Sequence, residues 1–153
     1  MVVAPKSVSD AIAGAGGAGK AQVRILANGE RASVGDIEIE AVAMYNLTAD
    51  RLRYHTKGVG NSYVLGLAGT RVYVSGDTED IPEMRALESI DLAFICMNLP
   101  FTMTPDQAAS AVLEFKPRVV YPYHYRGQDT GRFESLVEAG AAGIVVRLRN
   151  WYP

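Results

Sequence analysis

The stretch that decides the fold is Arg71-Val72-Tyr73-Val74-Ser75-Gly76-Asp77-Thr78, a strand-like run that stops at a glycine and an acidic residue. Val72 and Val74 alternate with more polar neighbours, as a half-buried strand requires. Gly76 permits a sharp turn of the backbone, so that Asp77 projects from the end of the strand. A carboxylate in that position suits a metal ion, although a turn-forming or helix-capping aspartate has the same local pattern.

A second strand-like run ends at another potential metal ligand far downstream. The run is Arg118-Val119-Val120-Tyr121-Pro122-Tyr123-His124-Tyr125, and His124 is one of only two histidines in the chain. Imidazole and carboxylate groups are both common zinc ligands. Two strand ends thus offer an aspartate and a histidine to one site.

Four short strings in this chain carry a family resemblance. They are Ser75-Gly76-Asp77-Thr78, Ile81-Pro82-Glu83-Met84, Phe101-Thr102-Met103-Thr104-Pro105 and Tyr121-Pro122-Tyr123-His124-Tyr125. In order and spacing they resemble the metallo-β-lactamase superfamily, in particular its branch of metal-dependent hydrolases similar to ascorbate-phosphate lactonase. The resemblance implies that Asp77 bridges two metal ions and that His124 completes the second metal site. It also implies that the ions are zinc, manganese or iron.

The same resemblance leads us to expect the C-terminal half of such an enzyme. The family signature His-x-His-x-Asp-His supplies most of the metal ligands and should precede a segment like Met1-Val2-Val3-Ala4-Pro5, where this chain begins. With two histidines in all, the chain does not contain the full ligand set. We therefore expect a single domain over residues 1–153 that is weakly active or inactive alone. We also expect it to form a homo-oligomer or to pair with an N-terminal half.

Composition agrees with one compact unit and excludes several kinds of partner. The chain has 153 residues, of which 48% are hydrophobic, and its net charge is -2 with both signs interspersed. It has no basic stripe for nucleic acid and no polybasic patch for a membrane, which leaves a small-molecule substrate. The single cysteine, Cys96, lies in an apolar run that predicts a buried thiol. We expect a cytoplasmic location, the alternative being that a signal segment preceded Met1.

The glycine-rich segment from Gly14 to Lys20 matches the spacing of two nucleotide-binding motifs. A helix rather than a strand is expected before it, and Ala21 stands where the phosphate loop needs Ser or Thr for magnesium. We therefore interpret this segment as a connector after a helix.

The remaining pattern predicts an α/β fold. Strands are expected at residues 2–4, 22–26, 36–42, 61–67, 70–74, 91–96 and 144–146; the second and third form a β-meander, and the fourth and fifth a hairpin. Helices are expected from an N-cap at Ser7 to Ala13, from Pro82 to Leu87, from a capping box at Thr104, and over residues 131–139. This order predicts a mostly antiparallel sheet with helices on one side. By the resemblance, such a sheet is half of an αββα sandwich.

The long segment 44–60 mixes aromatic, basic and amide side chains, a composition typical of a binding loop. It resembles the substrate-facing loop of the family. This implies substrate contacts for Tyr45, Asn46 and His55, and for Tyr123 at the end of its strand. For His55 three roles remain open, namely metal ligand, substrate contact and structural histidine.

Two functional hypotheses from different classes follow. The first is a metal-dependent hydrolase in which Asp77 and His124 are catalytic, because they hold the ions that activate water against a lactone, an ester or a phosphoester. The second is a metal-free remnant that acts as a binding or assembly module. The number of metal ligands separates them, since a zinc site normally needs roughly three or four from the protein.

Overall fold

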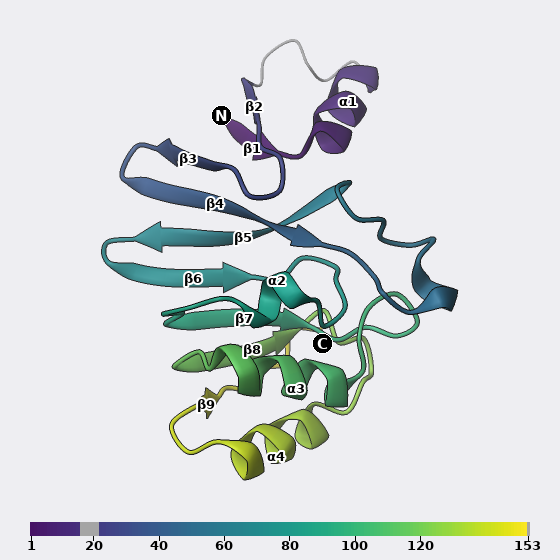
Figure 1. Cartoon of the computed structure of the whole chain (residues 1–153), viewed down its shortest axis with the longest axis vertical. Helices are drawn as coiled ribbons and strands as arrows, with labels where there is room; N and C mark the ends of the chain where they lie inside the picture. The colour runs from purple at the N-terminus through teal and green to yellow at the C-terminus, as the bar shows by residue number, and fades with distance from the viewer. Residues whose placement is uncertain (16–21, 153) are drawn as a thin grey trace.

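The computed structural model describes residues 1–15 and 22–152. Their strands form a two-stranded sheet, β1-β2, and a seven-stranded sheet in the order β3-β4-β5-β6-β7-β8-β9 (Figure 1). The strands are Val2–Ala4 (β1), Val23–Ile25 (β2), Arg31–Val34 (β3), Ile37–Met44 (β4), Gly60–Leu67 (β5), Thr70–Val74 (β6), Leu92–Cys96 (β7), Val119–Tyr123 (β8) and Val145–Val146 (β9). The helices are Lys6–Gly14 (α1), Pro82–Arg85 (α2), Pro105–Phe115 (α3) and Thr130–Gly140 (α4), with a 3-10 turn at Ala49–Arg51 (η2). The connector predicted for the glycine-rich segment lies, at residues 16–21, outside the described residues.

The strand pairing in the large sheet changes from antiparallel to parallel at β6. Strands β3 to β6 are antiparallel neighbours, whereas β6 to β9 run parallel to one another, so the sheet is mixed and not mostly antiparallel as predicted. Parallel strands need a crossover between them, and α2, α3 and α4 each occur in one of the three crossovers. The carboxyl ends of β6, β7 and β8 therefore lie at the same edge of the sheet.

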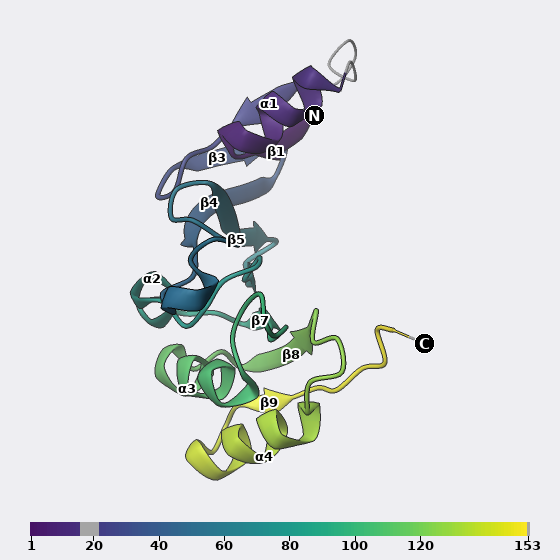
Figure 2. The ribbon, with the colours of Figure 1, turned by 90° about the vertical axis from the view of Figure 1, so that its right-hand side faces the viewer.

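Helices α2, α3 and α4 cover one face of this sheet, which confirms the predicted α/β class (Figure 2). Between them and the strands lies the main core, where Tyr73, Ile95, Val112, Val120 and Phe133 are fully buried. The two faces of β6 differ because side chains alternate along a strand. Tyr73 points into this core, so its neighbours along the strand point to the other face.

Two local predictions are confirmed by the hydrogen bonding and the backbone angles. Thr104 accepts a hydrogen bond from the N–H of Gln107, and the Gln107 side chain accepts one from the N–H of Thr104, which is a capping box. Strands β5 and β6 are joined through Ala68 and Gly69, whose φ angles of 48° and 84° suit a tight two-residue hairpin.

The N-terminal part differs from the prediction in three ways. Strand β2 does not join the meander. It pairs in parallel with β1, which precedes it in the chain with α1 between them. Its expected place is taken by β3, which was not predicted and which pairs with β4. Ser7 is also not the N-cap of α1, because Pro5 takes that position and the Ser7 hydroxyl instead donates to the carbonyl oxygen of Val59 at 2.6 Å.

The sheet face opposite α2 to α4 keeps apolar side chains partly exposed to solvent. Ile37 is 40% exposed and Leu67 is 36% exposed, and the strand register places both on one face with Leu65. Within residues 1–15 and 22–152, no helix has both the length and the apolar content needed to span a membrane.

Candidate metal centre

Asp77, His124 and His55 lie together at the edge where the parallel strands end. Asp77 Oδ1 is 3.5 Å from His124 Nε2, and Asp77 Oδ2 is 3.8 Å from His55 Nε2. Each oxygen of one carboxylate therefore faces a different imidazole. The Asp77 and His124 side chains are 38% and 39% exposed, so the cluster is open to solvent.

The backbone at Gly76 directs Asp77 toward the two histidines. Gly76 has a φ of 59°, and a Cβ atom there would come within 2.9 Å of Met44 Sδ and 3.0 Å of the Asn61 carbonyl oxygen. Only glycine satisfies both the left-handed backbone and the narrow space. The turn predicted from the Gly76-Asp77 sequence is confirmed.

His55 reaches the cluster from the long loop between β4 and β5, and a buried ion pair holds that loop. The Glu79 side chain is 2% exposed and accepts hydrogen bonds from Arg51 at 2.6 Å and from the N–H groups of Leu47 and Thr48 at 2.6 and 2.7 Å. The N–H of Asn46 donates to the His55 carbonyl oxygen at 2.9 Å. Glu79 therefore sets the path of the loop that delivers His55.

The electrostatics of the cluster keep His55 neutral and Tyr123 protonated. Burial lowers the pKa of His55, Asp77 opposes that shift, and His124 adds to it. Burial raises the pKa of Tyr123, and Cys96 and Asp77 raise it further. A neutral imidazole has a free lone pair on one ring nitrogen, which is the form that binds a metal ion.

Asn98 belongs to this site although the sequence did not point to it. It is 2% exposed and follows β7, and its Nδ2 lies 3.0 Å from His124 Nε2. Its backbone N–H donates to the Thr102 hydroxyl at 2.7 Å, which fixes its position, while its Oδ1 is buried without a hydrogen-bond partner among the described residues. The available signal was the position of a polar side chain just after a buried parallel strand.

Tyr45 and Asn46, predicted to contact substrate, are buried in supporting positions. The Tyr45 hydroxyl donates to Glu83 at 2.9 Å, and the Asn46 amide donates to the carbonyl oxygens of Arg51 and Phe101. These contacts do not involve the Asp77 cluster. The predicted substrate roles of Tyr45 and Asn46 stay predictions, as does that of Tyr123.

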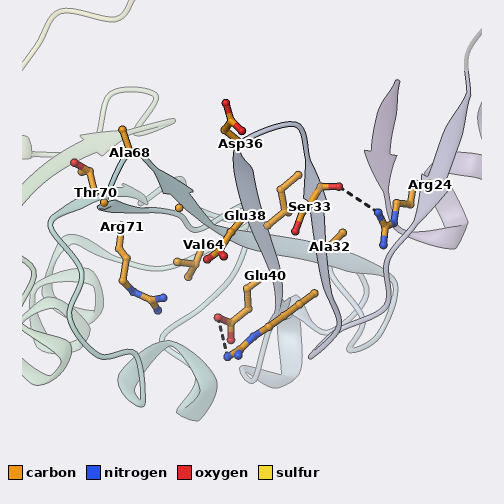
Figure 3. Close-up of a pocket in the computed structure, with 14 residues that line it drawn as sticks. Arg24, Ala32, Ser33, Asp36, Glu38, Glu40, Val64, Ala68, Thr70 and Arg71 are labelled. Carbon is orange, nitrogen blue, oxygen red and sulfur yellow. Dashed lines mark hydrogen bonds and ion pairs between the residues drawn. The ribbon is translucent and has the colours of Figure 1, made fainter.

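A groove of about 760 Å³ lies over β3 to β6 (Figure 3). Arg31 pairs with Glu40 at 3.2 Å on its wall, and Arg24 donates to the Ser33 carbonyl oxygen at 3.3 Å. Asp77, His55 and His124 do not line it. The groove and the cluster are therefore separate features of the sheet.

The cluster supplies part of a metal site. Two imidazole nitrogens and a carboxylate are donors that zinc, iron and manganese accept. Over residues 1–15 and 22–152, however, no group of three or more His, Cys, Asp and Glu side chains is gathered closely enough to hold a metal ion. The donor types therefore fit a metal, whereas the present spacing is that of two Asp-His pairs.

Comparison with known proteins identifies the family. A protein named "UPF0173 metal-dependent hydrolase" from Thermococcus onnurineus is 34% identical over an aligned length of 125 residues, and the alignment covers 74% of this chain and 56% of that protein. The chain thus spans about half the length of that relative.

Solved structures agree with this comparison. A crystal structure from Parabacteroides distasonis, of a proposed metal-dependent hydrolase, has a TM-score of 0.88 and 38% identity and covers 98% of this chain and 64% of that one. Igni18, a metallo hydrolase from Ignicoccus hospitalis, shares the fold with a TM-score of 0.75 at 23% identity, over 96% of this chain and 64% of that one. The family model described as "Beta-lactamase superfamily domain" matches residues 1–125. This chain therefore belongs to the beta-lactamase superfamily.

Proposed function

We propose that this chain supplies Asp77, His124 and His55 to the metal centre of a hydrolase. One observation carries the proposal: the two oxygens of Asp77 face two different imidazoles, at 3.5 and 3.8 Å. A carboxylate between two nitrogen donors is an arrangement that can join two metal ions. The names of the relatives, metal-dependent hydrolases, support the same reaction class.

The residues of the chain have distinct roles in this proposal. Asp77 and His124 would hold the metal, and His55 would be a further ligand because its Nε2 faces Asp77 Oδ2 at 3.8 Å. Asn98 contacts His124 Nε2, the nitrogen that faces Asp77, so this contact would give way to a metal ion bound there. A bound metal ion would lower the pKa of water and polarise the bond to be cleaved.

The substrate we propose is a small lactone, ester or phosphoester. Each of these has an oxygen that a metal ion can polarise, and each is cleaved by an attacking hydroxide. The half-exposed cluster allows such a molecule to approach from solvent. For Tyr123 we propose a hydrogen bond donated to this molecule, because its raised pKa keeps the hydroxyl protonated.

The metal we propose is zinc, with iron or manganese as the other candidates. Nitrogen and carboxylate donors suit all three ions, and zinc most often takes about four ligands in such sites. The described residues offer three donors, so water, substrate or further protein ligands would fill the remaining positions. The metal-free binding module considered from the sequence has no support among the relatives, whose names specify metal dependence.

A titration of the chain with Zn²⁺, followed by the imidazole NMR signals of both histidines, tests the proposal. We expect weak binding that perturbs His55 and His124 together, little hydrolysis by the isolated chain, and loss of the response in Asp77→Ala. The exposed turn residue Asp36 serves as the matched control, as Asp36→Ala. A titration that is unchanged by Asp77→Ala would refute the assignment.

The same titration separates the possible roles of His55. If His55 is a ligand, His55→Ala weakens Zn²⁺ binding, whereas a substrate contact or structural role leaves binding unchanged. Asp77→Ala and His124→Ala should each leave the melting temperature nearly unchanged, because both side chains are more than a third exposed. A large loss of stability would assign them a structural role instead.

A further inference from the structure

The C-terminal tail, residues 147–152, returns to the strand end that carries His124. The Tyr152 hydroxyl accepts a hydrogen bond from the backbone N–H of His124 at 3.0 Å. These residues are 28 positions apart in the chain, so the contact is tertiary. Tyr152 therefore contacts a proposed metal ligand directly.

His124 has a backbone conformation that needs such support. Its φ is 47°, in the left-handed region that non-glycine residues rarely adopt. Such a residue persists only when its surroundings fix it. The Tyr152 hydroxyl bonds the N–H of this residue, while Asn98 contacts its ring, so the backbone and the side chain of His124 are held by different partners.

The tail is anchored well enough to act as a fixed partner. Trp151 Nε1 donates to the Pro122 carbonyl oxygen at 2.9 Å, and its ring lies 6.3 Å from that of Tyr121. The Tyr125 hydroxyl donates to the Arg149 carbonyl oxygen at 3.0 Å. These contacts anchor Arg149 and Trp151, which shortly precede Tyr152 in the chain, and so limit its movement relative to β8.

We propose that Tyr152 is a positioning residue for His124. Its hydroxyl holds the left-handed backbone at the end of β8, so that the His124 ring stays beside Asp77. The proposed role in metal binding rests on the function proposed above, whereas the effect on the conformation of His124 does not. Because Tyr152 is 49% exposed, this role is local and does not extend to the core.

The test compares Tyr152→Phe with the wild-type chain by NMR. The substitution removes the hydroxyl and keeps the ring, so the His124 amide loses its acceptor. We expect amide hydrogen exchange at His124 to become about tenfold faster, as expected for the loss of one hydrogen bond. We also expect the Zn²⁺ concentration at which the His124 imidazole signal is half shifted to rise about fivefold, with the melting temperature unchanged.

Tyr121→Phe is the matched control, because the Tyr121 ring lies against Trp151 of the same tail and its hydroxyl makes no hydrogen bond to the described residues. The proposal is overturned if Tyr152→Phe and Tyr121→Phe give the same His124 exchange rate. It is also overturned if Tyr152→Phe lowers the melting temperature by several degrees, which would assign the tail a global role. If Zn²⁺ does not change the imidazole NMR signals of the wild-type chain, the proposed function alone is refuted, because the amide exchange measurement needs no metal.

Discussion

Replacing Glu79 by alanine should destabilise the chain more than any surface substitution. The Glu79 side chain is 2% exposed and pairs with Arg51, whose side chain is 20% exposed. Its other oxygen accepts the N–H groups of Leu47 and Thr48. The substitution leaves the Arg51 guanidinium without its counter-ion and the N–H groups of Leu47 and Thr48 without their acceptor.

The size of the effect follows from these contacts. Removing one partner of a buried ion pair costs about 3–5 kcal/mol, because the remaining charge is left uncompensated. Arg51 keeps a hydrogen bond to the Thr102 carbonyl oxygen, which favours the lower end of that range. We therefore expect the free energy of unfolding to fall by about 3 kcal/mol. The double variant Glu79→Gln with Arg51→Met removes both charges. It should lower the free energy of unfolding by less than the sum of the losses in the two single variants.

The pH dependence of this pair has a definite sign. Burial alone would raise the pKa of Glu79, but hydrogen bonds from Thr48, Leu47 and Arg51 outweigh burial and hold the pKa below its usual value. A lowered pKa means that the unfolded chain binds the proton more readily. The contribution of Glu79 to stability is therefore present at neutral pH and is lost as the pH falls through its folded-state pKa.

Urea unfolding at neutral pH, and again at acid pH, measures both effects. Glu88→Ala is the control, because Glu88 is exposed. The reasoning is refuted if Glu79→Ala and Glu88→Ala differ by less than about 1 kcal/mol at neutral pH, which is below the cost of one unsatisfied buried group. It is also refuted if the difference grows as the pH falls.

Two further predictions concern the backbone turn and the exposed sheet face. Gly76→Ala should lower the free energy of unfolding by about 2 kcal/mol, since the new Cβ would lie 2.9 Å from Met44 Sδ and 3.0 Å from the Asn61 carbonyl oxygen. Gly29→Ala, with a φ of 87° but open space around it, should cost less in the same urea experiment; equal losses would contradict the packing argument. The chain should also self-associate through the face that carries Ile37 and Leu67, which light scattering at low micromolar concentration would detect. Ile37→Lys with Leu67→Lys should reduce the association, and a monodisperse wild-type monomer would disprove it.

The sequence predicted the elements whose signals are local. The β5-β6 hairpin, the capping box at Thr104 and the turn at Gly76 each depend on residues that are close together in the chain. Asp77 and His124 could be proposed as a pair because each follows a strand-like run. Their chemical role stays a prediction, although the structure brings them within 3.5 Å.

The sequence could not predict the features that depend on distant contacts. Strand β2 has the pattern of a meander strand, and only its pairing with β1 across α1 separates it from the large sheet. Asn98 and Tyr152 reach His124 from positions 26 and 28 residues away. The approach of His55 to Asp77 likewise depends on the loop path that Glu79 and Arg51 set.

The meeting of three strand ends at one edge has a consequence for how this protein can diversify. Asp77, Asn98 and His124 lie in the short segments that follow β6, β7 and β8, and none of them lies within the strands. The core that fixes these strands lies beneath the helices, so a substitution at a strand end leaves that core intact. Selection can therefore replace the reacting groups one segment at a time on an unchanged support, and related chains can acquire new substrates before they acquire a new architecture.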